Sequence, residues 1–155
     1  MNSGRFNRWL TLGANVATLL GVLLVILQLQ ENRALMRAQV RHDLAEGIVD
    51  LLDSAAGNSQ LAGVLRRGNL GEDLTPDEQM QFSVRTNALF RYWEDVHYQY
   101  RQGLFDESEF STQKEAWRGY LASSKGAVAY WCSVRTLYSP AFSAELDSLL
   151  PAHGC

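Results

Sequence analysis

One pair of residues in the sequence has the spacing of a metal site. Glu94 and His97 are separated by two residues, which places a carboxylate and an imidazole on one face of a helix. Di-iron helical bundles combine two such pairs with two further glutamates. The chain has two other histidines, His42 and His153, and neither follows an acidic residue at that spacing. We therefore expect Glu94 and His97 to form hydrogen bonds on or between helices, and we predict no metal and no other cofactor.

The densest group of aromatic and hydrogen-bonding side chains lies between Phe90 and Arg101. Within it, Tyr92, His97, Tyr98 and Arg101 could line a ligand cleft or a partner surface, because each combines an apolar body with a polar tip. Aromatic residues at helical spacing more often belong to a core. We therefore expect a helix that is buried on several sides, with the cleft as the alternative.

The two cysteines are the other side chains with reactive chemistry. Cys132 has no histidine nearby in the sequence, and its neighbours Trp131 and Val134 indicate burial, so we expect a core thiol rather than a nucleophile. Cys155 is the last residue, where we expect a frayed chain, so the sequence predicts no disulfide framework. The sequence also contains no glycine-rich phosphate loop and no serine elbow. No catalytic residue is predicted.

An apolar run near the start of the chain is the element around which the helices must be arranged. Trp9 to Leu29 contains no charged side chain, and at about 1.5 Å per residue it spans roughly 30 Å, the thickness of a bilayer's hydrocarbon core. A cleaved signal peptide would have a shorter apolar core and a cleavage site of small residues, whereas this run ends in QLQENR. A buried core helix rarely continues so far without a charge. We predict an uncleaved transmembrane helix, which makes the lipid bilayer a partner of the chain.

Small residues recur along one line of this predicted span. Gly13, Ala17 and Gly21 are four residues apart, which would let another transmembrane helix pack closely, from a second copy or from a larger membrane complex. Glycine and alanine are also common in membrane helices generally, so both interpretations stay open. Asn15 and Thr18 would face the lumen if such helices formed a small oligomeric pore.

Arginines flank the span on both sides. Arg5 and Arg8 precede it, and Arg33, Arg37 and Arg41 follow it about one helical turn apart. Because a short N-terminal tail crosses a membrane easily and the three arginines at the exit favour an anionic cytoplasmic leaflet, we expect a cytoplasmic C-terminal domain. The net charge is −3, and acidic residues outnumber basic ones from residue 71 onward. We expect no nucleic-acid partner, because phosphate contacts need a basic face.

The helix is expected to continue beyond the membrane as an amphipathic exit helix over residues 30–57. This stretch contains no proline before the glycine at its end. Its apolar stripe repeats every four residues: Met36, Val40, Leu44, Ile48 and Leu52. Such a stripe needs a partner, so either the distal domain folds back on it or another copy packs there.

Beyond residue 57 the sequence predicts further helices and no strand. Thr75, Pro76 and Glu78 form the clearest start signal, an N-cap hydroxyl with a proline at the first helical position and a capping-box glutamate. Gly68 is expected to end the helix before it, and the concentration of aromatic residues from Phe82 onward places the core there. The predicted helices cover 59–67, 76–102, 107–121, 125–137 and 140–150. The fold class is all-α: an N-terminal transmembrane helix continuing into a small helical-bundle domain at 58–150, with tails at 1–8 and 151–155.

Four motifs give the chain a family resemblance: QLQENRALMRAQ at the end of the apolar run, LTPDEQMQF, FRYWEDVHYQYRQGLFDESEF, and WCSVRTLYSPAF. In this order they resemble an uncharacterised family of small bacterial single-pass membrane proteins with an N-terminal anchor and a helical C-terminal domain. The resemblance covers most of the chain. It implies a shared fold, an anchor and the bacterial inner membrane, and it brings no activity, cofactor or catalytic residue. The basic tail with Arg5 and Arg8 departs from the family pattern.

These features lead us to expect a non-catalytic, membrane-anchored helical protein that mediates assembly, as a homo-oligomer or as an accessory subunit of a larger membrane complex. One alternative is a membrane-tethered ligand sensor or enzyme with a cleft near Tyr92, His97, Tyr98 and Arg101. The other is the small oligomeric pore.

Overall fold

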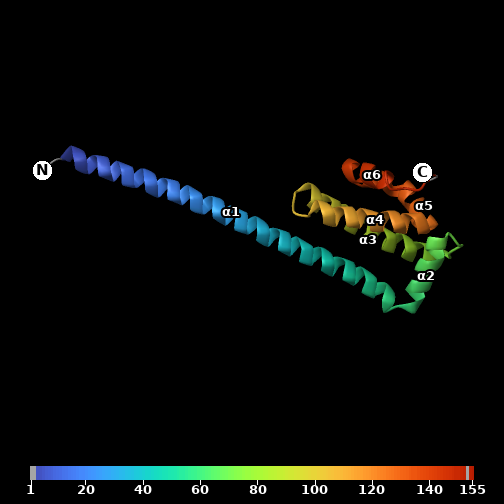
Figure 1. Cartoon of the computed structure of the whole chain (residues 1–155). Helices are drawn as coiled ribbons and strands as arrows, with labels where there is room; N and C mark the ends of the chain where they lie inside the picture. Colours follow the sequence, from blue (N-terminus) through green and yellow to red (C-terminus); the bar gives the residue numbers. More distant parts are fainter. Residues whose placement is uncertain (1–2, 153) are drawn as a thin grey trace. The chain divides into compact units, whose positions relative to one another are not determined.

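The computed structural model describes residues 3–152 and 154–155, and this part of the chain is all-α (Figure 1). It contains six α-helices and one short 3-10 helix, and the described residues form no strand. The first helix, α1, covers Ser3–Ala56, so helix also occupies 3–8, where a tail was expected. Residues 1–2 of that tail, and His153 of the C-terminal tail, lie outside the described residues.

The chain divides into two compact units, Met1–Gln39 and Val40–Cys155, with the boundary inside α1. The first unit consists of the N-terminal part of α1. By length and composition α1 could cross a membrane, and its most apolar stretch is entirely unburied. Two threonines of this stretch satisfy their hydroxyls within the helix, because Thr11 donates to the carbonyl of Asn7 and Thr18 to that of Ala14, each at 2.9 Å.

The second unit contains the end of α1 and the remaining helices. They are α2 (Ser59–Leu70), α3 (Pro76–Arg101), α4 (Glu107–Ser123), α5 (Lys125–Val134), a 3-10 helix (Arg135–Leu137) and α6 (Pro140–Asp147). The predicted start signal is confirmed: the Thr75 hydroxyl accepts from the N–H of Glu78, and the Glu78 carboxylate accepts from the N–H of Thr75. Each bond satisfies a backbone donor that the first turn of a helix leaves free.

The end of α2 differs from the prediction. The helix passes through Gly68 and ends at Gly71, which takes the left-handed conformation with φ 76°. Gly68 serves close packing instead, since a Cβ there would lie 2.3 Å from the ring of Phe82. Gly126 on α5 fits against the same point, where a Cβ would lie 1.9 Å from the carbonyl oxygen of Gly68. Two glycines thus let α2 and α5 approach each other at backbone distance.

The last two helices are shorter than predicted. α5 ends at Val134 and the chain tightens into a 3-10 turn over Arg135–Leu137; beyond it Ser139, which precedes a proline, is held in an extended conformation. α6 ends at Asp147, where Leu149 and Leu150 donate to carbonyls only three residues back. Bonds of this length close a tighter final turn than the α-helix allows.

The core is aromatic, as the concentration of rings from Phe82 onward predicts. Trp93 of α3 stacks on Trp117 of α4 with ring centroids 5.2 Å apart, and Phe90 meets the edge of Trp131 of α5 at 5.4 Å. The C-terminal part of α1 joins this core through Leu44, which is 7% exposed. Of the two partners expected for the apolar stripe, the distal domain is therefore the one that covers Leu44.

The cysteine prediction is wrong. Cys132 is not a free core thiol: it forms a disulfide with Cys155. After α6 the chain turns back, with the N–H of Gly154 donating to the carbonyl of Pro151 at 2.8 Å, and this brings Cys155 beside α5. The turn depends on contacts that α6 makes with the core, which the spacing of two cysteines cannot reveal.

Candidate functional site

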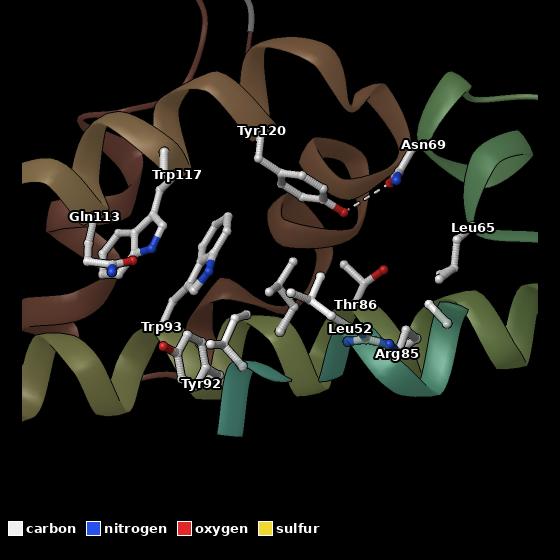
Figure 2. Close-up of a pocket in the computed structure, with 14 residues that line it drawn as sticks. Leu52, Leu65, Asn69, Arg85, Thr86, Tyr92, Trp93, Gln113, Trp117 and Tyr120 are labelled. Carbon is white, nitrogen blue, oxygen red and sulfur yellow. Dashed lines mark hydrogen bonds between the residues drawn. The ribbon is translucent and has the colours of Figure 1, made fainter. Parts of the chain in front are cut away.

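The second unit contains a cavity of about 370 Å³ between the end of α1 and helices α2, α3 and α4 (Figure 2). We call it the Arg85 cavity. Its lining is mostly apolar and includes these residues: Ile48, Leu52, Ala55, Leu65, Asn69, Arg85, Thr86, Leu89, Tyr92, Trp93, Gln113, Ala116, Trp117 and Tyr120. The described lining residues carry no carboxylate, imidazole or thiol, and their polar side chains are Asn69, Arg85, Thr86, Tyr92, Gln113 and Tyr120.

Helical periodicity explains how three elements line this cavity. Ile48, Leu52 and Ala55 are spaced by four and three residues, so they lie on one face at the end of α1. The lining residues of α3 and of α4 follow the same three- and four-residue spacing. The exposed fraction of Leu52 is 60%, so the α1 side is the open wall.

Arg85 is the only charged residue in the described lining of the cavity. Its Nη2 donates to the backbone carbonyl of Leu51 in α1, whereas its buried Nε has no hydrogen-bond acceptor. No carboxylate of the described chain is among the groups that shift the pKa of Arg85. Burial lowers the pKa of Arg85, because removal from water disfavours the charged form. The guanidinium is therefore a half-buried cation without a counterion.

Two further polar groups of the cavity, on α2 and α4, are joined by a hydrogen bond. The Tyr120 hydroxyl donates to Oδ1 of Asn69 at 3.0 Å, which joins the two helices, and burial raises the pKa of Tyr120 (Figure 2). The indole N–H of Trp117 is buried without an acceptor. Unpaired buried donors such as this one and Nε of Arg85 are uncommon in folded proteins, and each needs an explanation.

The four residues predicted to share a cleft do not form one surface. Tyr92 lines the Arg85 cavity, where burial raises its pKa. His97 is 5% exposed and lies between the rings of Phe110 and Phe142, on another side of α3. Tyr98 and Arg101 are exposed. Aromatic packing between α3 and its neighbours thus occupies the place where the cleft was expected.

Glu94 and His97 also contact different residues. The Glu94 carboxylate accepts from the N–H of Ser139 at 2.8 Å and from Nη1 of Arg91 at 2.7 Å. Burial raises the pKa of Glu94, but these hydrogen bonds outweigh it and hold the pKa below its usual range. Burial lowers the pKa of His97. Among the residues that the structure describes, no cluster of three or more potential metal ligands occurs.

The predicted membrane residues are placed as follows. Gly13, Ala17 and Gly21 lie on the exposed surface of the first unit, where a Cβ at either glycine would meet no atom within 4 Å. Arg33 and Arg37 are exposed on the same helix. Arg41, in the second unit, pairs with Glu109 of α4 at 2.9 Å, which holds the end of α1 against the domain.

Sequence reasoning missed Arg85, although a signal for it exists. Arg85 precedes Leu89 by four residues and Trp93 by eight, so it stands in register with an apolar stripe of α3. A charged residue in such a register indicates either a buried ion pair or a ligand site.

Comparison of the chain with protein-family models, with curated proteins and with solved structures found no match.

Proposed function

We propose that this chain is a non-catalytic, single-pass membrane protein of the bacterial cell membrane that mediates assembly. The proposal depends chiefly on the apolar run of α1 from Trp9 to Leu29, which has no charge and stays exposed throughout. Exposing that much apolar surface to water is unfavourable, whereas a bilayer covers it and leaves the backbone hydrogen bonds closed within the helix.

The proposed partner is another transmembrane helix, from a second copy or from a larger complex in which this chain is an accessory subunit. Support comes from the line of Gly13, Ala17 and Gly21, whose surface is open to close approach. A pore has less support, because the Thr18 hydroxyl is already paired within the helix.

Two features disagree about the side of the membrane on which the domain lies. The arginines at 33, 37 and 41 favour the cytoplasm, but Arg5 and Arg8 nearly balance them. The disulfide between Cys132 and Cys155 favours an oxidising compartment, because cytosolic thiols are kept reduced. We give the disulfide more weight and propose an extracytoplasmic domain, which reverses the expectation from the arginines.

Membrane anchoring is tested by fractionation. The wild-type chain is expected to stay with membranes washed at high pH and to be released by detergent. A variant with Leu20→Arg and Leu24→Arg should move to the soluble fraction, because each charge near the middle of a span costs about 3 kcal/mol. Leu70→Arg, at an exposed apolar residue outside the run, is the matched control and should stay in the membrane. A wild-type chain released without detergent would contradict the anchor.

Assembly is tested by native mass spectrometry after mild extraction. We expect an oligomer or a co-purified membrane protein, and we expect Gly13→Ile with Gly21→Ile to abolish it, because the added side chains prevent close approach. Ala14→Ile with Val22→Ile, on a neighbouring face of the same helix, should leave it intact. A strictly monomeric wild-type chain without any co-purified partner would contradict the proposed assembly.

A further inference from the structure

We propose that the Arg85 cavity binds a single-chain anionic amphiphile, of the size and charge of a medium-chain fatty acid. The site lies wholly within the second unit, and the argument uses its size, its lining and its one uncompensated charge. It does not depend on the proposed membrane anchor.

Size and lining define the body of the ligand. An apolar cavity of about 150 Å³ binds benzene, so 370 Å³ suits roughly twelve to fifteen non-hydrogen atoms. The walls are leucine, isoleucine and alanine side chains together with Trp93, Trp117 and Tyr92 (Figure 2). Such walls stabilise an alkyl chain by removing it from water, at about 0.8 kcal/mol for each buried methylene group. A protein helix, which is about 10 Å wide with its side chains, is too bulky for this volume.

Charge defines the head of the ligand. Arg85 lines the same cavity, where Nη2 of its guanidinium donates to the carbonyl of Leu51 and its buried Nε has no acceptor. No carboxylate of the described chain is among the groups that act on its pKa. A carboxylate is the natural complement of a guanidinium, because two parallel hydrogen bonds join the two planar groups. A neutral or cationic amphiphile would leave the half-buried charge uncompensated, which is unfavourable.

The cavity therefore combines an apolar space with one cation at its wall. A free carboxylate amphiphile would fill the space with its alkyl chain and pair its carboxylate with Arg85. Asn69, Thr86 and Tyr120 add hydrogen-bonding groups on the walls. The open side formed by Ile48, Leu52 and Ala55 of α1 provides an entry path.

The test uses the full chain in nanodiscs of zwitterionic lipid and a decanoic acid that carries a photoreactive diazirine. Labelled peptides are mapped by mass spectrometry, and labelling of the Trp9–Leu29 run serves as an internal measure of partition into the bilayer. We expect a second set of labelled peptides, from α3 and α4 around Trp93 and Trp117. Decanoate should compete for this second set at a concentration about tenfold lower than decanol or decyltrimethylammonium, since a charge-assisted hydrogen bond is worth at least that factor.

Variants separate the charge from the space. Arg85→Gln should reduce cavity labelling about tenfold relative to the apolar run, whereas Arg118→Gln, at an exposed arginine of α4, should leave it unchanged. Ala116→Phe keeps the arginine and fills the space, so it should also reduce labelling. Circular dichroism checks that each variant folds, and the competition experiment needs no variant.

Three results would overturn the proposal: no labelling around Trp93 and Trp117, equal competition by the neutral and cationic amphiphiles, or equal labelling of Arg85→Gln and Arg118→Gln. If cavity labelling persists while the apolar run is unlabelled, the anchor proposal fails and the ligand proposal stands.

Discussion

At the scale of single residues, burial decides how His97 behaves. Its imidazole is enclosed by Phe110 and Phe142, and burial lowers its pKa. Glu145 and Glu94 act in the opposite direction, whereas Arg101 and Lys114 add to the lowering. The folded protein therefore holds the neutral imidazole, and the unfolded chain binds a proton more readily at mildly acidic pH.

This difference makes stability depend on pH. The pKa of His97 is lower in the folded state than in the unfolded chain, where it is about 6.5. The free energy of unfolding should therefore be highest above pH 6.5 and should decrease as the pH falls below that value. Urea unfolding at pH 7.5 and pH 5.5 measures the loss. His97→Phe should reduce the loss of unfolding free energy between the two pH values. His42→Phe, at an exposed histidine of α1, should show the same loss as the wild type. Equal pH dependence in wild type and His97→Phe would refute the assignment.

At the scale of elements, the contact between α2 and α5 depends on two glycines. Gly68 and Gly126 meet where a Cβ on Gly126 would lie 1.9 Å from a backbone oxygen, and a backbone atom cannot move aside as a flexible side chain can. The two helices can keep their separation only without that Cβ.

We therefore expect Gly126→Ala to destabilise the domain by about 2–3 kcal/mol, since overpacking a tight contact forces the backbone apart. Gly119→Ala is the matched control. Gly119 also lies inside a helix, α4, but a Cβ there meets no atom within 4 Å. This control should be stabilised by about 0.5–1 kcal/mol through helix propensity. Denaturant unfolding compares the two, and a Gly126→Ala variant as stable as the wild type would exclude the close contact.

At the scale of the whole molecule, the disulfide is expected to stabilise the domain and to indicate the compartment in which the domain lies. The disulfide joins Cys132 of α5 to Cys155, across a sequence separation of 23 residues. A cross-link of this span restricts the unfolded chain and stabilises a domain by about 3 kcal/mol. It persists where the surroundings are oxidising.

Modification with a large maleimide reagent tests both consequences in one gel. The chain isolated from cells under denaturing conditions should stay unmodified without reductant and should shift by two additions after reduction. Cys155→Ser should leave one reactive thiol, and the purified variant should unfold at a lower denaturant concentration than the wild type. Two reactive thiols in the untreated wild-type chain would contradict both the disulfide and the extracytoplasmic domain.

The sequence by itself determined what depends on neighbours along the chain. The all-α class, the charge-free run from Trp9 to Leu29, and the capping box of Thr75 and Glu78 follow from composition, periodicity and hydrogen bonds within one helical turn. The aromatic core beyond Phe82 follows for the same reason, because helical spacing collects the rings on shared faces.

Only the tertiary structure decided what depends on residues distant in sequence. In the structure α2 ends at Gly71 and not at Gly68, and Gly68 packs closely against Phe82 and α5. It paired Cys132 with a cysteine beyond α6, and it placed Arg85 beside a cavity without a counterion. Approach distances and the burial of a charge arise only when helices pack, so local patterns do not contain them.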